Sequence, residues 1–205
     1  MRNLLILFYL LLALATKGQV KTQIVDHSSL SKTFTFKGKA VHAQRFQDKT
    51  GAYLSILTQT GAIPQKADDE FMQAHLYAYV YKPKAGSAPL LLWQVHDMIT
   101  DCNLDLAANF IAGAYRITDL DRDGKAEVWL GYRLTCRGDV SPGVFKIIMY
   151  EGKTKYAMRG VGKIKIGSHL QPDGGEIESN DFSKGPTVFN QYASKLWREF
   201  VVEKI

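Results

Sequence analysis

The chain has 205 residues, and 46% of them are hydrophobic, which is enough for one domain with a substantial core. Its formal net charge of +6 falls to +4 once Arg2 and Lys17, in the leader described next, are set aside. This mild charge gives no indication of nucleic-acid binding, whereas anionic sugars, lipid head groups and cell-wall polymers remain candidate partners.

The first 18 residues have the features of a signal peptide. Met1-Arg2-Asn3 is a short basic head, and Leu4 to Leu14 is an apolar run too short for a membrane anchor. Small residues follow, and we expect cleavage after Gly18, with Ala15 as the alternative. We therefore expect a signal peptide over 1–18 and a single soluble domain over 19–205, located in the periplasm or secreted, with no transmembrane anchor.

The first half of the mature chain reads as strands separated by turn signals. Asp48-Lys49-Thr50-Gly51 has the composition of a hairpin turn, and the stretch 61–70 reads as a polar connection. We expect strands at 33–36, 39–46, 52–60, 75–81 and 90–98.

The second half changes character towards its end. The segment 101–108 is compatible with one helical turn, and we expect strands at 110–117, 126–136, 144–151 and 154–166. The acidic stretch 168–184 reads as a binding loop or a disordered one. After Gly185-Pro186, apolar residues recur with a helical period up to Phe200, which predicts an amphipathic helix covering one sheet face. No fixed repeat is found, so we expect a mainly β, antiparallel domain of about eight strands with a C-terminal α-helix.

An acidic stretch between two of these strands is the strongest candidate site. Carboxylates stand at positions 1, 3, 5 and 9 of a loop, and Gly124 at position 6 permits a sharp turn. An EF-hand would need Glu at position 12, where Leu130 stands. The loop resembles the strand-loop-strand calcium loops of the FG-GAP and VCBS repeat families. We expect a calcium-binding site; the alternative is an acid-rich hairpin turn. The expected ligands are the side chains of Asp119, Asp121, Asp123 and Glu127 and the carbonyl of Lys125.

Cys102 and Cys136 are the only cysteines in the chain. In an oxidising compartment we expect them to form one disulfide; two free buried thiols are the alternative. The closed loop contains the whole acidic stretch, so we expect the disulfide and the metal to brace the same part of the fold. Closing about 35 residues stabilises a fold by roughly 4 kcal/mol on the chain-entropy model.

Two further patterns are candidate binding surfaces. One is an aromatic strand face that could stack on sugar rings, or be the second packed face of a sheet. The other is a row of cations at odd positions of one predicted strand, a candidate anion-binding site or an ordinary solvated face. The aromatic face consists of His75, Tyr77, Tyr79 and Tyr81, and the cationic row of Lys153, Lys155, Arg159, Lys163 and Lys165.

Signals for catalysis are weak. The five histidines show no recognisable metal-binding spacing, and we find no nucleophile elbow and no phosphate-binding glycine loop. A carboxylate pair for glycoside cleavage stays open, because the separations of the remaining acids are unknown from sequence. The candidates are Asp101, Asp105, Asp139 and Glu151.

Five sequence blocks together resemble a family of small exported bacterial proteins labelled "surface polysaccharide biosynthesis protein". The resemblance covers most of residues 34–166 and implies a cell-envelope setting, without supplying a reaction. A second similarity, in the single calcium loop within an exported β domain, is to periplasmic lysozyme inhibitors. We therefore expect a non-enzymatic envelope protein that binds a surface polysaccharide or a protein partner. The alternatives are a carbohydrate-active enzyme of surface polysaccharide biosynthesis and a periplasmic inhibitor of a cell-wall hydrolase. The blocks are 101–102, 117–129, 136–142, 146–152 and 156–160.

Overall fold

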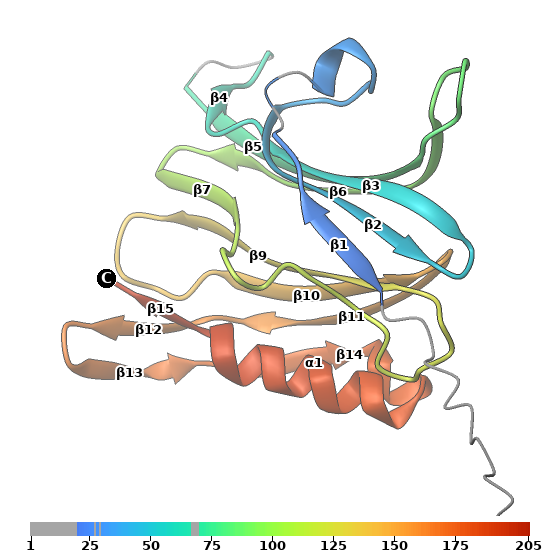
Figure 1. Ribbon diagram of the computed structural model, residues 1–205. Helices are drawn as coiled ribbons and strands as arrows, with labels where there is room; N and C mark the ends of the chain where they lie inside the picture. Colours follow the sequence, from blue (N-terminus) through green and yellow to red (C-terminus); the bar gives the residue numbers. More distant parts are fainter. Residues whose placement is uncertain (1–19, 27, 29, 67–69) are drawn as a thin grey trace, which may run out of the picture.

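The computed structural model describes residues 20–26, 28, 30–66 and 70–205, and the predicted signal peptide over 1–18 lies outside them. Two six-stranded sheets face each other, and a helix covers the outer side of the second (Figure 1). A three-stranded sheet lies beside this helix. No helix in the described ranges is long and apolar enough to cross a membrane.

The first sheet takes up the N-terminal half of the chain, and all its strand pairs are antiparallel. β2 and β3 form a hairpin in which Asp48 is paired with Gly51, so the turn itself is Lys49-Thr50. The strands are β1 (Lys21–Ile24), β2 (Lys39–Asp48), β3 (Gly51–Gln59), β4 (Ile63–Pro64), β5 (Met72–Lys82) and β6 (Leu90–Cys102).

The second sheet is also antiparallel, and β9 is its longest strand. β7 and β8 both pair with β9, at its C-terminal and N-terminal parts respectively. The strands are β7 (Asp105–Phe110), β8 (Arg116–Thr118), β9 (Glu127–Arg137), β10 (Val144–Glu151), β11 (Thr154–Val161) and β14 (Ile177–Asn180).

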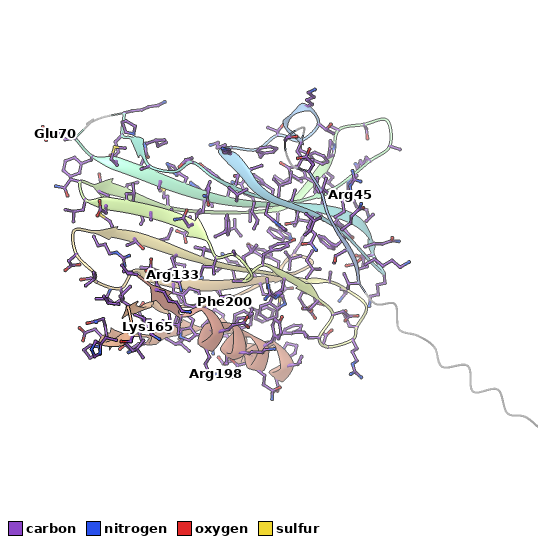
Figure 2. The ribbon with its side chains drawn as sticks, turned by 60° about the vertical axis from the view of Figure 1, so that its left-hand side comes forward. Arg45, Glu70, Arg133, Lys165, Arg198 and Phe200 are labelled. Carbon is purple, nitrogen blue, oxygen red and sulfur yellow. A yellow bond between two sulfur atoms is a disulfide. The ribbon has the colours of Figure 1, made fainter. Side chains whose placement is uncertain are left out.

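The third sheet and the helix close the C-terminal end of the chain. β12 (Lys163–Ile166) pairs antiparallel with β13 (His169–Gly174) and parallel with β15 (Val202–Lys204). α1 (Thr187–Phe200) begins directly after Pro186, which cannot donate within a helix but is tolerated at its start. Arg133 of β9 donates to the Phe200 carbonyl at the end of α1, and Figure 2 shows these two residues close together. Two short 3₁₀ turns complete the fold, Leu30–Lys32 and Asp181–Lys184.

Alternation along β5 and β9 produces three apolar layers. Leu76, Ala78 and Val80 of β5 face the second sheet and pack with Val128 and Leu130 of β9 among other residues. The opposite face of the first sheet packs against the chain after β1, through Leu30, Phe34 and Phe36. The opposite face of the second sheet packs against α1. Both sheets are therefore covered on both sides over part of their area.

Cys102 and Cys136 form the expected disulfide, with their Cα atoms 5.9 Å apart. Cys102 ends β6 of the first sheet, and Cys136 lies in β9 of the second, so the bond joins the two sheets. It lies at the far end of β9 from the acidic stretch, about 30 Å away at the rise of an extended strand. The expectation that the disulfide and the metal loop brace the same part is therefore wrong, because they lie at opposite ends of β9.

The predicted fold class holds at the coarse level, since the protein is mainly β with one C-terminal helix. The described residues form fifteen strands in three sheets, however, and not the expected domain of about eight strands. Residues 33–36 are irregular because they cross over the first sheet instead of pairing with it. The predicted helical turn at 101–108 contains the end of β6, a short crossover and the first residues of β7. The acidic loop at 168–184 contains β13 and β14. The predicted strand 110–117 is mostly a loop between β7 and β8.

Candidate functional site

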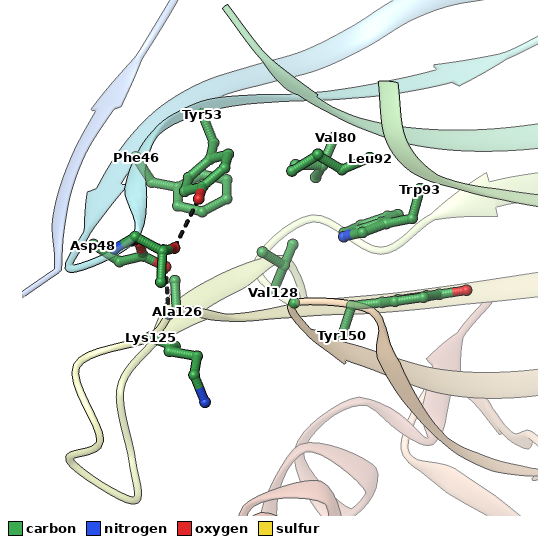
Figure 3. Close-up of a pocket in the computed structure, with 12 residues that line it drawn as sticks. Phe46, Asp48, Tyr53, Val80, Leu92, Trp93, Lys125, Ala126, Val128 and Tyr150 are labelled. Atoms are coloured by element: carbon green, nitrogen blue, oxygen red, sulfur yellow. Dashed lines mark hydrogen bonds between the residues drawn. The ribbon is translucent and has the colours of Figure 1, made fainter. Parts of the chain in front are cut away.

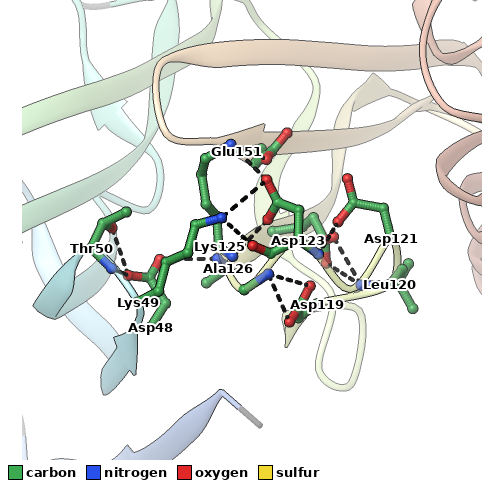
Figure 4. A network of polar contacts seen from close by, with 12 residues as sticks. Asp48, Lys49, Thr50, Asp119, Leu120, Asp121, Asp123, Lys125, Ala126 and Glu151 are labelled. Atoms are coloured by element: carbon green, nitrogen blue, oxygen red, sulfur yellow. Dashed lines mark hydrogen bonds and ion pairs between the residues drawn. The ribbon is translucent and has the colours of Figure 1, made fainter. Parts of the chain in front are cut away.

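The acidic stretch forms the connection between β8 and β9. Gly124 has φ of +84°, a conformation that glycine adopts without steric cost and that the sharp turn requires. Its N–H points at both carboxylate oxygens of Asp119, each 3.2 Å away. The N–H groups of Asp123 and Lys125 donate to the Asp121 and Asp123 carboxylates. The loop is thus folded around its own carboxylates (Figure 4).

The loop brings three of the predicted ligands together. Carboxylate oxygens of Asp119, Asp121 and Glu127 lie within 4.8 Å of one another. Two oxygens bound to one calcium ion, at 2.3–2.6 Å each, are separated by at most about 5 Å. Glu127 is fully buried, and Thr118 Oγ1 donates to its Oε2 at 2.6 Å. These hard oxygen donors fit a calcium ion, which would neutralise a buried carboxylate.

Asp123 belongs to a second acidic group, with Asp121 and Glu151, whose oxygens also lie within 4.8 Å. Lys125 places its ammonium group between two of them, 2.6 Å from Asp123 Oδ2 and 3.2 Å from Glu151 Oε1. Glu151 was not among the predicted ligands. It comes from the end of β10, where it pairs with Glu127 of β9, and only this register brings it to the loop.

The electrostatics of the group follow from these contacts. Burial raises the pKa of the Glu127 carboxyl, and the bonds from Thr118 and the Leu120 N–H only partly oppose it. Burial also acts on Asp123, but the hydrogen bonds from Lys125 outweigh it and lower the pKa of that carboxyl. The same bond to Asp123, followed by that to Glu151, raises the pKa of Lys125. Lys125 therefore serves as a fixed countercharge on one side of the acidic loop.

The hairpin turn of the first sheet is bound to this loop. Asp48 Oδ2 accepts the Ala126 N–H at 3.0 Å, and the Lys49 N–H donates to the Gly124 carbonyl at 2.9 Å. The Lys49 ammonium group also reaches Asp123, 3.8 Å from its Oδ2. The acidic loop is therefore attached to the first sheet through this one turn.

A small apolar pocket opens between the sheets beside this junction (Figure 3). Its volume is about 110 Å³, and Trp93 and Tyr150 stack in its wall with ring centroids 4.2 Å apart. The polar side chains around it already have partners within the protein, since Thr50 donates a hydrogen bond to Asp48 and Lys125 forms an ion pair with Asp123. The pocket is thus suited to an apolar group rather than to a hydroxylated ligand.

The predicted aromatic face exists but is mostly covered. Tyr77, Tyr79 and Tyr81 are 5%, 3% and 4% exposed, and their rings follow one another along β5 at about 6 Å. The Tyr79 hydroxyl accepts the Lys37 N–H, and the Tyr81 hydroxyl donates to the Thr35 carbonyl. Tyr79 and Tyr81 therefore hold the segment 33–37 on the sheet, and only His75 at the end of the row is half-exposed.

A groove remains between that segment and β6. Its volume is about 400 Å³, and Tyr79 and Tyr81 contribute to its floor. Phe34 and Phe36 are half-buried in its wall, and Leu91 is 43% exposed. No sequence pattern marked this groove, because residues 33–37 are brought to β6 only by the tertiary fold.

The cationic row is divided between two sheets. Lys155 and Arg159 lie on β11, where Arg159 is paired with Lys146 of β10 and forms an ion pair with Asp181. Lys163 and Lys165 lie on β12, and Lys163 donates to the Pro172 and Gly174 carbonyls. Figure 2 shows Lys165 in the third sheet. The expected alignment on one strand is wrong, since the strand ends at Val161 and the chain enters another sheet after Gly162. Lys153 lies in the β10–β11 turn.

The four carboxylates considered for glycoside cleavage lie at two ends of the molecule. Asp105 faces Arg137 next to the disulfide, and Asp101 and Asp139 are near it in the chain. Glu151 is at the other end of β9, bound to Lys125. Comparison of the chain with family models, with curated proteins and with solved structures finds no match.

Proposed function

We propose that the mature chain is a non-enzymatic binding module of the bacterial cell envelope that holds a glycan in the groove between segment 33–37 and β6. A calcium ion in the acidic loop stabilises the fold and takes no part in chemistry. The disulfide is consistent with an oxidising compartment outside the cytoplasm, as an exported protein requires. The resemblance to surface polysaccharide proteins supports a carbohydrate as the ligand.

The observation that carries the proposal is the composition of the groove. Sugar rings offer apolar C–H faces and a rim of hydroxyls, so they need aromatic surface with unoccupied polar groups beside it. The aromatic surface is supplied by Phe34 and Phe36. Four exposed polar side chains of the groove make no hydrogen bond or ion pair with any other part of the described chain, and these are Thr33, Thr35, Lys37 and Gln94.

The enzymatic alternative has no comparable observation in its favour among the described residues. A glycosidase needs two carboxyl groups facing one cleft, at about 5–10 Å. Among the described residues, none that lines the groove has a carboxylate.

The proposal is tested with the mature protein on an array of bacterial polysaccharides, at saturating calcium. Binding should then weaken in Phe36→Ala and Gln94→Ala. Losing the half-buried phenyl ring costs about 1 kcal/mol, or roughly fivefold in Kd. Phe110→Ala and Gln191→Ala are matched controls from β7 and α1, and they should bind as the unchanged protein does. Retention of full affinity in both groove variants, or no glycan bound at all, would contradict the proposal.

A further inference from the structure

Two histidines meet on the outer face of the first sheet. His75 of β5 and His96 of β6 are diagonal neighbours, because His96 is paired with Tyr77. His75 Nδ1 and His96 Nε2 are 3.0 Å apart. The histidine pair, as we call it, lies on the opposite face of this sheet from the second sheet, so it is separate from the acidic loop.

Both rings are held in place by neighbours. His75 Nε2 lies 3.1 Å from Gln73 Oε1, an oxygen that can only accept a hydrogen bond. His75 therefore carries its proton on Nε2, and its Nδ1 lone pair faces His96. The His96 ring stacks on Tyr77, with centroids 4.5 Å apart and an interplanar angle of 8°. A histidine that donates its other N–H to a carbonyl oxygen is the usual arrangement around a bound metal.

We infer that the histidine pair is a two-imidazole chelate for a cupric ion. Moving the His96 proton from Nε2 to Nδ1, with no net proton loss, leaves a lone pair on each of the two nitrogens that lie 3.0 Å apart. With metal–nitrogen bonds of about 2.0–2.1 Å, a separation of 3.0 Å gives an N–metal–N angle of about 95°. This is close to the right angle between neighbouring ligands of tetragonal Cu²⁺, and it is narrower than the tetrahedral angle of zinc sites.

The surroundings keep the chelate available at neutral pH. Burial, followed by the charges of His96 and Lys37, lowers the pKa of His75, so its ring is uncharged there. His96 is exposed, so a metal can approach and its remaining positions can hold water. The inference does not depend on glycan binding, because neither histidine of the pair lines the groove.

The test is a calorimetric titration of the mature protein with Cu²⁺, buffered by glycine, in excess calcium that occupies the acidic loop. We expect binding at the pair with two nitrogen donors in the electron paramagnetic resonance spectrum. His75→Gln and His96→Gln should each abolish that signal. Gln73→Leu should weaken binding by about 10-fold or more, since it removes only the group that orients His75.

His42→Gln is the matched control, because His42 is also a strand histidine beside a glutamine but contacts no second imidazole among the described residues. It should leave the titration unchanged. The inference is overturned if the unchanged protein binds no Cu²⁺, or if a His75→Gln/His96→Gln double variant binds it with the same affinity and spectrum.

Discussion

Replacing Asp48 by alanine should weaken the connection between the two sheets at the acidic-loop end. Its carboxylate accepts hydrogen bonds from the Thr50 N–H at 2.7 Å, the Thr50 hydroxyl at 2.6 Å and the Gly51 N–H at 3.2 Å. Its second oxygen accepts the Ala126 N–H at 3.0 Å, and Ala126 is only 4% exposed. One side chain therefore closes the hairpin turn and anchors the acidic loop.

The cost of Asp48→Ala can be worked out from these bonds. Leaving the buried Ala126 N–H without an acceptor costs about 1–3 kcal/mol. The N–H groups of the hairpin turn can hydrogen-bond to water instead, so the loss of their bonds to Asp48 adds only about 1 kcal/mol. The sum is about 2–4 kcal/mol, which for a chain of this size lowers the melting temperature by roughly 5–15 °C. Asp48→Asn keeps one oxygen for the turn and loses the bond to Ala126. Its free energy of unfolding should therefore lie between those of the unchanged protein and Asp48→Ala.

The assay is urea denaturation followed by tryptophan fluorescence, at constant calcium and with the disulfide intact. Asp139→Ala is the control, because Asp139 accepts one turn N–H, from Ser141, in an exposed position. It should change the free energy of unfolding by no more than about 1 kcal/mol. If Asp48→Ala is as stable as Asp139→Ala, the hairpin does not hold the acidic loop and the reasoning fails.

Three further outcomes are expected. Reducing the disulfide should lower the free energy of unfolding by up to roughly 4 kcal/mol, and denatured, unreduced protein should show no free thiol on titration. Burial, followed by the charges of His96 and Lys37, lowers the pKa of His75, so its contribution to stability is present above about pH 6.5 and is lost as the pH falls below that value. His75→Gln should flatten this loss in denaturation midpoints measured from about pH 7 to pH 5. Gly160→Ala should destabilise the protein by at least about 1–3 kcal/mol in the same assay, because its Cβ would lie 2.0 Å from a backbone oxygen of the segment before β14.

The parts of the fold that were predictable have a strong local period. The alternation of β5, the hairpin after Asp48 and the helical spacing up to Phe200 each depend on a residue's near neighbours. The disulfide was predictable because the chain has only two cysteines. The acidic loop was predictable because its spacing alone places carboxylates on one side of a turn.

The parts that were missed depend on contacts distant in sequence. The alternation of cationic and apolar residues continues past Gly162, yet the chain leaves one sheet and enters another there. Lys155 and Lys163 therefore lie in different sheets. Glu151 joins the acidic group only through the register of β9 and β10. Alternation along β5 shows that its tyrosines share a face, but not that residues 33–37 cover it.

The central claim, that the acidic loop is a calcium site that stabilises the fold, is tested most directly by titrating the mature protein with calcium. Calorimetry should show one ion per chain with a Kd near 10⁻⁴ M, the order found for extracellular modules. At ten times that concentration the ion should add about 1.4 kcal/mol of stability and raise the melting temperature by roughly 3–6 °C. Asp121→Ala, which removes the carboxylate shared by both acidic groups, should abolish binding and the temperature rise. No heat of binding together with identical melting curves in calcium and in chelator would show that the loop is only an acidic turn.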